Sequence, residues 1–253
     1  MRPTSLKGGF ETLVYKWLIF DADGTLFDFR RAEALALQMT PTQLGIDVPE
    51  NFANTYHRIN DALWQLFEKG EMEARNVRLQ RFQRLFGNLH LEGDPTAFSE
   101  AFLKNLIRET RFLDGAQPLL ETLKGCVSLA LLTNGFADVQ RARIARLGLQ
   151  DTFQHVLISE ELGVAKPGRA IFDIAFERMG QPGRAHVLII GDSLSSDIRG
   201  GADYGIDTCW LNLDRRGNTS DIVPTYEIRD LQDVLRVLSP PGRDDGQSSS
   251  RST

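Results

Sequence analysis

The sequence contains only two cysteines, Cys126 and Cys209, among its 253 residues. Two cysteines cannot form the disulfide framework that stabilises small secreted proteins. Each lies within an apolar stretch that predicts a β-strand, so we expect both to be buried thiols in a reducing compartment. The cysteine content therefore argues against a disulfide-stabilised extracellular domain.

Long apolar runs are also missing. No stretch approaches the roughly 18 consecutive apolar residues that a membrane-spanning helix requires, and the first residues lack the apolar core and cleavage site of a secretory signal. We therefore expect a cytoplasmic protein that does not bind membranes. Residues 1–13, which include Gly8 and Gly9, are typical of a flexible leader, and residues 239–253 have the composition of a disordered tail.

The sequence lacks an excess of positive charge: 29 lysines and arginines against 34 acidic residues give a net charge of -5. This balance argues against a surface for nucleic acid polymers. An acidic protein that handles an anion must concentrate positive charge locally, through a metal ion, a lysine or helix N-termini. The composition is otherwise ordinary, with 42% hydrophobic and 25% charged residues, as in a folded globular protein.

The stretch from residue 29 to residue 112 lacks any β-rich run. It is rich in Leu, Gln, Glu and Arg, and apolar residues such as Ile59, Leu63 and Leu66 recur at helical spacing. We predict that residues 29–112 form an all-helical cap domain, inserted between the two segments of a core domain, residues 14–28 and 113–238.

Apolar strands alternate with amphipathic helices in the rest of the chain. The predicted strands cover residues 17–20, 127–132, 156–158, 187–190 and 208–211. This alternation predicts an α/β fold, with a parallel sheet covered by helices on both faces. Ligands bind such sheets at the carboxyl ends of the strands, so the residues just after each strand are the informative ones.

The first predicted strand ends in Asp21-Ala22-Asp23-Gly24-Thr25. Side chains two residues apart share a face, so the carboxylates of Asp21 and Asp23 leave the strand in the same direction. Their repulsion is relieved by a hard divalent cation such as Mg²⁺. One carboxylate can then attack phosphorus while its neighbour transfers protons. A plain turn is the alternative explanation of this stretch, because Asp and Gly are common turn residues.

Polar residues also follow the later strands. They are Thr133-Asn134-Gly135, then Lys166, then Gly191-Asp192-Ser193, and finally Asp197. Singly, each has a structural explanation as a helix N-cap, an exposed lysine, a turn residue or a helix-start acid. Together with Asp21 and Asp23, they place a hydroxyl, a cation and four carboxylates at one sheet edge, a combination that chance rarely supplies.

The residue types indicate their roles. The hydroxyl and amides of Thr133, Asn134 and Gly135 suit the oxygens of a phosphoryl group. Lys166 can neutralise the nucleophile and the charge of the transition state. Asp192 would be a further metal ligand, and Asp197 would bond to metal-bound waters or to Lys166.

These residues resemble the four motifs of the haloacid dehalogenase-like (HAD) superfamily, over about residues 15–238. The resemblance implies Asp21 as nucleophile and Asp23 as general acid and base, with Thr133, Lys166 and Asp197 completing the catalytic set. It also implies Mg²⁺ held by Asp21, the backbone oxygen of Asp23, and Asp192. The expected fold is a Rossmannoid sheet with a helical cap between the first two motifs.

Three longer stretches resemble the bacterial pyrimidine 5'-nucleotidase branch of this superfamily: residues 133–136, 156–167 and 208–212. Gly24 departs from that branch, which often carries Glu there. The branch implies a nucleotide substrate such as dUMP, dTMP or UMP. In the cap, Tyr56, Asn60 and Trp64 can stack on and hydrogen-bond a base, although core or surface positions explain them equally well.

Other functions stay open. Phosphoglycolate or another small phosphate ester is the alternative substrate, and a sugar-phosphate mutase uses the same core motifs. A dehalogenase has no need of Asp23, and a phosphate-accepting receiver domain has no use for a helical lid. The expected partner is thus a small phosphorylated metabolite, bound by a monomer or homodimer.

Overall fold

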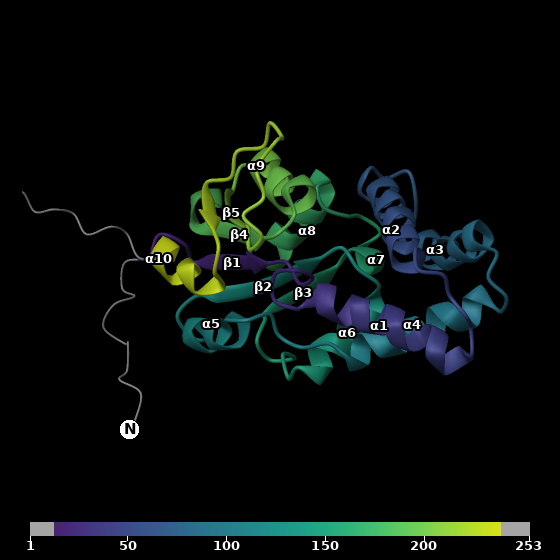
Figure 1. The fold of residues 1–253 in the computed structure, drawn as a ribbon. Coiled ribbons are helices and arrows are strands. Elements are labelled where there is room, and N and C mark those ends of the chain that lie inside the picture. The colour runs from purple at the N-terminus through teal and green to yellow at the C-terminus, as the bar shows by residue number, and fades with distance from the viewer. Residues whose placement is uncertain (1–12, 239–253) are drawn as a thin grey trace, which may run out of the picture.

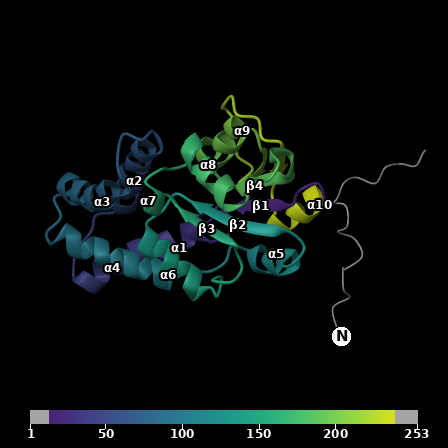
Figure 2. The same ribbon diagram turned by 180° about the vertical axis from the view of Figure 1, so that it is seen from behind.

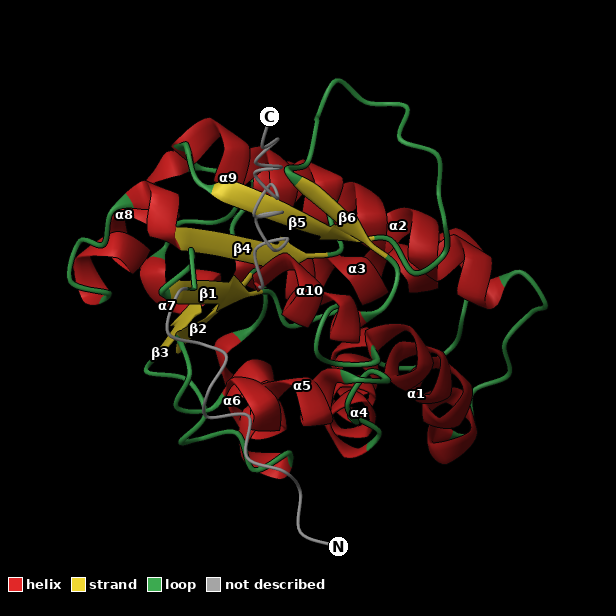
Figure 3. Cartoon of the chain, turned by 90° about the vertical axis from the view of Figure 1, so that its left-hand side faces the viewer, coloured by secondary structure: helices red, strands yellow, loops and turns green. Residues whose placement is uncertain are grey.

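The computed structural model describes residues 13–238 and contains one parallel sheet of six strands. The leader expected over residues 1–13, apart from Leu13, and the tail expected over residues 239–253 lie outside the described residues. The strand order is β3-β2-β1-β4-β5-β6, and Figure 3 shows these strands as a single twisted layer. The strands are β1 (Trp17–Phe20), β2 (Ser128–Thr133), β3 (His155–Ile158), β4 (Val187–Gly191), β5 (Asp207–Leu211) and β6 (Tyr226–Ile228).

The central strand β1 is apolar on both faces, as a strand covered by helices on both sides must be. Leu18 and Phe20 face a cluster that includes side chains of α5 (Ala116–Leu123) and α10 (Val234–Leu238). Ile19 faces the opposite cluster, with side chains of α8 (Arg169–Arg178) and α9 (Arg199–Tyr204). Figures 1 and 2 show these two helical layers on either side of the sheet.

The register of the strands aligns their carboxyl ends. Phe20, the last residue of β1, pairs with Leu131 of β2 and with Ile190 of β4. The residues that follow these three strands therefore meet at one edge of the sheet. The helix after β2 is α6 (Ala137–Arg146), and the short helix after β3 is α7 (Ser159–Leu162).

Four helices inserted between β1 and α5 form the cap: α1 (Phe29–Leu44), α2 (Phe52–Glu68), α3 (Ala74–Leu89) and α4 (Pro95–Arg108). They share a hydrophobic cluster centred on aromatic side chains such as Phe82, Phe98 and Phe102. In Figures 1 and 2, α2 and α3 lie at the end of the molecule opposite α10.

The two chain crossings between core and cap lie side by side. The Asp28 amide donates to the Arg111 carbonyl (3.1 Å), and the Leu113 amide donates to the Leu26 carbonyl (2.8 Å). These bonds fall where the sequence predicts the domain boundaries, residues 28/29 and 112/113. The exact boundaries stay a prediction.

The predicted fold class is confirmed: a parallel α/β sheet with helices on both faces and an inserted helical cap. The sequence missed β6, whose three residues are too short to show a strand pattern. The expectation for Cys126 was wrong, because this residue lies in the turn before β2 and is exposed, whereas Cys209 is buried in β5. Among residues 13–238, no helix combines the length and apolar character needed to cross a bilayer.

Candidate active site

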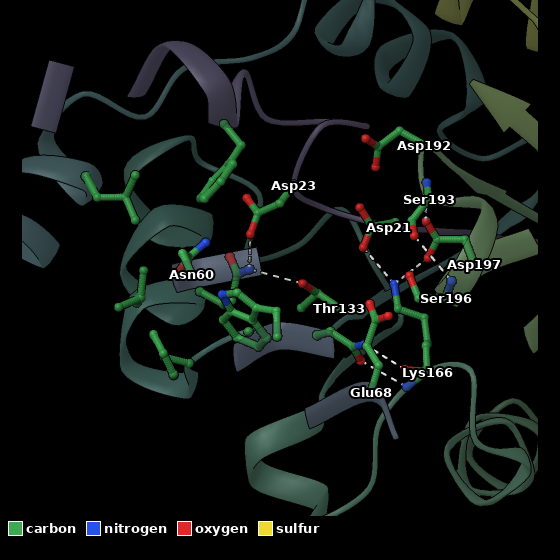
Figure 4. Close-up of a pocket in the computed structure, with 18 of the residues that line it drawn as sticks. Asp21, Asp23, Asn60, Glu68, Thr133, Lys166, Asp192, Ser193, Ser196 and Asp197 are labelled. Atoms are coloured by element: carbon green, nitrogen blue, oxygen red, sulfur yellow. Dashed lines mark hydrogen bonds and ion pairs between the residues drawn. The ribbon is translucent and has the colours of Figure 1, made fainter. Parts of the chain in front are cut away.

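A cavity of about 350 Å³ lies between the carboxyl edge of the sheet and the cap. Figure 4 shows side chains converging on it from strand ends and from the cap helices. It is lined by every core residue that the sequence singled out: Asp21, Asp23, Thr133, Asn134, Gly135, Lys166, Asp192 and Asp197. The expected convergence of strand-end residues is therefore a feature of the structure, while their chemical roles stay proposals.

Lys166 is buried at the centre of the site. Its ammonium group donates three hydrogen bonds: to Asp21 Oδ1 (2.7 Å), to Asp197 Oδ1 (2.7 Å) and to the Leu132 carbonyl (2.6 Å). Burial opposes the charge, but the carboxylates of Asp197 and Asp21 outweigh it and hold the pKa of Lys166 above its ordinary value. The lysine is therefore a fixed positive charge beside the expected nucleophile.

Asn134 holds the backbone of Lys166 in place. Its Nδ2 donates to the Lys166 carbonyl (2.8 Å), and its Oδ1 accepts from the Lys166 amide (3.0 Å). Both ends of this side chain are thus engaged in positioning the lysine. The substrate contact expected of Asn134 stays a prediction.

Three carboxylates form the candidate metal centre. Oxygens of Asp21, Asp192 and Asp197 lie within 4.8 Å of one another. Burial raises the pKa of Asp21 well above its ordinary value, and burial together with the nearby Asp197 raises the pKa of Asp192 to about 7. A divalent cation would relieve both effects by favouring the charged forms.

The partners of these carboxylates indicate which of them would bind a metal ion. Both oxygens of Asp197 are engaged, Oδ1 with Lys166 and Oδ2 with the Ser193 amide (3.1 Å). Among the described residues, no hydrogen bond or ion pair engages the carboxylate of Asp192. The residues therefore fit Mg²⁺ with Asp21 and Asp192 as carboxylate ligands, and Asp197 as a partner of Lys166.

Gly24 makes room for the Asp192 carboxylate. Its φ of +86° is one that side-chain-bearing residues rarely adopt, and an added Cβ would lie 2.6 Å from Asp192 Oδ2. The glycine at this position thus suits both the left-handed backbone turn and the close approach of Asp192.

Asp23 is held by two residues that the sequence analysis missed, Gln140 and Arg143 of α6. Arg143 Nη1 donates to Asp23 Oδ1 (2.5 Å), and Gln140 Nε2 donates to Asp23 Oδ2 (2.8 Å). Gln140 Oε1 accepts from Arg143 Nη1 (3.2 Å), which turns the amide nitrogen toward Asp23. Both side chains are 1% exposed, so this carboxylate is fixed by buried donors.

The same glutamine orients Thr133. Gln140 Nε2 also donates to Thr133 Oγ1 (3.0 Å), so the hydroxyl acts as an acceptor there and keeps its own proton to donate. Gly135 permits this approach, because a Cβ at this position would lie 2.6 Å from Gln140 Nε2. The signal that could have identified Gln140 and Arg143 is their i, i+3 spacing on the helix directly after Thr133.

Of the three cap residues expected to contact a base, two line the cavity and one does not. Asn60 and Trp64 line the cavity, as expected, together with Glu68, which accepts a hydrogen bond from Ser195 Oγ (3.3 Å) across the cleft. The expectation for Tyr56 was wrong. Its ring is fully buried against Phe82 and does not line the cavity, because α2 turns this side chain into the aromatic core of the cap.

Comparison with known proteins gives consistent matches along most of the chain. The family model for haloacid dehalogenase-like hydrolases matches residues 15–205. The chain is 36% identical to the pyrimidine 5'-nucleotidase YjjG of Escherichia coli (88% of this chain, 98% of YjjG) and 34% identical to the pyrimidine 5'-nucleotidase PynA of Streptococcus pneumoniae (89% and 96%). The magnesium-bound crystal structure of the putative HAD-hydrolase YfnB from Bacillus subtilis is 38% identical, with a TM-score of 0.81 (88% of this chain, 98% of YfnB).

Proposed function

Because the chain belongs to the haloacid dehalogenase-like hydrolase family, we propose that it is a Mg²⁺-dependent phosphatase that hydrolyses pyrimidine nucleoside 5'-monophosphates. It is a phosphoric monoester hydrolase, the class to which its nucleotidase relatives belong. The observation that carries the proposal is the single cavity in which Lys166 joins Asp21 to Asp197, with Asp23 fixed beside them.

Asp21 is the proposed nucleophile. Lys166 holds its Oδ1, whereas no described residue bonds to Oδ2, which leaves this oxygen to attack phosphorus. The Oδ2–P bond forms as the bond from phosphorus to the ester oxygen breaks, giving an aspartyl-phosphate and a free alcohol. Mg²⁺, held by Asp21, Asp192 and the backbone oxygen of Asp23, would supply the positive charge that lets a phosphate dianion approach these acids.

Asp23 is the proposed proton carrier. It gives a proton to the departing ester oxygen and later accepts one from the water that hydrolyses the aspartyl-phosphate. The Thr133 hydroxyl donates a hydrogen bond to a phosphoryl oxygen. Lys166 balances the negative charge that grows in the transition state. Asp21, Asp23 and Thr133 lie at the carboxyl edge of the sheet, and Lys166 reaches them from the loop between α7 and α8.

The nucleotide part of the proposal rests on the two relatives named pyrimidine 5'-nucleotidases and on the cap. Asn60 and Trp64 line the cavity and offer an amide and an aromatic face to a base. A larger purine would hold the cap away from the core and admit water to the site. Phosphoglycolate is the alternative substrate, since it needs only the core residues.

A substrate panel tests this proposal. We expect higher kcat/KM values for dUMP and dTMP than for dAMP and phosphoglycolate, loss of activity in EDTA, and recovery with Mg²⁺. A preference for phosphoglycolate or dAMP would refute the nucleotide substrate, and full activity in EDTA would refute the metal. Transfer of phosphate between sugar positions without release of inorganic phosphate would indicate a mutase. The cytoplasmic location and the monomeric or homodimeric state stay predictions.

A further inference from the structure

Arg81, on α3 of the cap, is a buried cation for which the proposed chemistry has no use. It lines the catalytic cavity and is only 3% exposed. Its guanidinium lies over the rings of Phe82 (4.9 Å), Phe102 (5.0 Å) and Phe136 (5.2 Å). Phe136 belongs to the core domain, so Arg81 sits where cap and core meet.

The hydrogen bonds of Arg81 are incomplete. Nη1 donates to the Tyr56 hydroxyl at 3.5 Å, and that hydroxyl donates to Glu33. Nε and Nη2 are buried and have no partner among the described residues. No carboxylate of residues 13–238 forms an ion pair with Arg81. Burial lowers the pKa of Arg81, and such a buried charge is costly unless a ligand supplies the missing acceptors.

Arg78, one turn earlier on α3, is an arginine at the same interface that has a carboxylate partner. Its guanidinium also lies over Phe136 (4.6 Å), but Nη2 pairs with the carboxylate of Asp138. Arg81 lacks such a carboxylate and lines the cavity, whereas Arg78 does not line it. Arg78 also keeps its Nε buried without a partner among the described residues, so what distinguishes Arg81 is that it has no carboxylate partner there and lines the cavity.

A buried acceptor on the cap complements these donors. Asn60 lines the same cavity, is 6% exposed, and its Oδ1 has no partner among the described residues. Trp64, one turn further along α2, packs against Phe136 with ring centroids 5.3 Å apart and also lines the cavity. Nε and Nη2 of Arg81 and Oδ1 of Asn60 are thus unpaired polar atoms in residues that line this cavity, together with the aromatic ring of Trp64.

We propose that Arg81 is a specificity-determining residue that donates to a ring carbonyl of the substrate base while Asn60 accepts the neighbouring ring N–H. This inference rests on the proposed nucleotidase function and adds the residue that recognises the base. Uracil and thymine carry an N–H between two carbonyls, which matches this pattern. Cytosine lacks that ring N–H and adenine lacks a carbonyl, so both leave buried polar groups of the cap unpaired.

The test compares dUMP with 2-deoxyribose 5-phosphate, which has the same sugar and phosphate but no base. Wild type should favour dUMP. Arg81→Met should lower kcat/KM for dUMP by about 10- to 100-fold, the cost of a lost charged hydrogen bond. The same variant should leave 2-deoxyribose 5-phosphate within about threefold, because this substrate never reaches Arg81. Arg84→Met, an exposed arginine on the same helix, is the matched control.

The outcomes separate the two proposals. An equal loss on both substrates, or none on dUMP, would overturn the role of Arg81 while leaving the nucleotidase assignment in place. A wild-type enzyme that does not prefer dUMP to 2-deoxyribose 5-phosphate would overturn both.

Modified substrates test the contacts on the wild-type enzyme, without relying on a variant that folds. We expect 3-methyl-dUMP, which lacks the ring N–H, to lose about tenfold or more in kcat/KM. At least one of 2-thio-dUMP and 4-thio-dUMP should lose about threefold or more, because sulfur is a weaker acceptor than oxygen. If kcat/KM for all three analogues equals that for dUMP, the proposal is overturned.

Discussion

The two ends of the catalytic cavity differ in how their polar groups are satisfied. At the core end, Lys166 donates three hydrogen bonds, and both carboxylate oxygens of Asp23 accept one each from α6. At the cap end, Arg81 and Asn60 keep buried polar atoms without partners among the described residues. Lys166 and Asp23 are thus held by their neighbours before substrate arrives, although Arg143 Nη2 is also buried without a partner in the described part of the chain. Arg81 and Asn60, by contrast, depend on a bound ligand for their missing partners.

This difference separates chemistry from recognition. Charges that are already fixed by their neighbours can stabilise a transition state without reorganising, and they act on any phosphate ester. Unpaired groups on the cap discriminate, because a substrate that fails to pair them leaves them buried and unsatisfied. Changes at the core end should therefore affect all substrates alike, and changes at the cap end should affect only those that carry a base.

The largest effect is expected for Asp21→Asn. The amide cannot form the aspartyl-phosphate, so we expect activity to fall by more than about 10⁴-fold on dUMP and on p-nitrophenyl phosphate alike. Single-turnover kinetics would measure the loss, and circular dichroism would verify that the variant is folded. Asp203→Asn, at an exposed position of α9, is the control. A variant that keeps a tenth of the wild-type rate would exclude the covalent mechanism.

Asp23→Asn should be next in size, and its effect should depend on the leaving group. We expect a loss of about 10²- to 10⁴-fold on dUMP, whose alkoxide needs a proton to depart. The loss should be smaller on p-nitrophenyl phosphate, because p-nitrophenolate leaves without one. Steady-state rates on the two substrates provide the comparison. Equal losses would show that Asp23 is not the proton donor.

Gln140→Leu tests the residue that links Asp23 to Thr133. The change removes two donated hydrogen bonds and leaves Arg143 without the Gln140 acceptor. We expect kcat to fall by about 10- to 100-fold on both dUMP and p-nitrophenyl phosphate, since each lost buried bond costs about 1–3 kcal/mol. Gln117→Leu, at an exposed position of α5, is the control. A wild-type kcat would show that Asp23 and Thr133 are positioned without Gln140.

The sequence predicted the sheet and the core end of the cavity because both follow from local patterns. Apolar strands alternating with helices specify a parallel sheet, and such a sheet brings the residue after each strand to one edge. The sequence alone therefore places Asp21, Thr133 and Asp192 in one site, and it adds Lys166 from the loop before α8. Gln140 and Arg143 were missed because they lie on a helix face, where polar residues usually contact solvent.

The cap end could not be predicted in the same way. Which side of a cap helix faces the cavity depends on how four helices pack, and periodicity alone does not decide this. Tyr56 and Asn60 are both buried on α2, yet only Asn60 lines the cavity. Arg81 is one of several arginines on α3, and only tertiary packing distinguishes it from the exposed Arg84.

The smallest effect on turnover is expected for Tyr56→Phe. This variant tests whether the part of the cap that contacts substrate includes Tyr56. The Tyr56 hydroxyl bridges Glu33 and Arg81 behind the cavity, so its loss should change kcat/KM for dUMP by less than about threefold. Its main effect should be on stability, about 1 kcal/mol from the lost hydrogen bonds, or about 2–4 °C in Tm. Thermal unfolding and steady-state kinetics would measure both quantities. A loss of more than about tenfold on dUMP, with 2-deoxyribose 5-phosphate unaffected, would mean that Tyr56 contacts the base and that the recognition surface of the cap extends into its aromatic core.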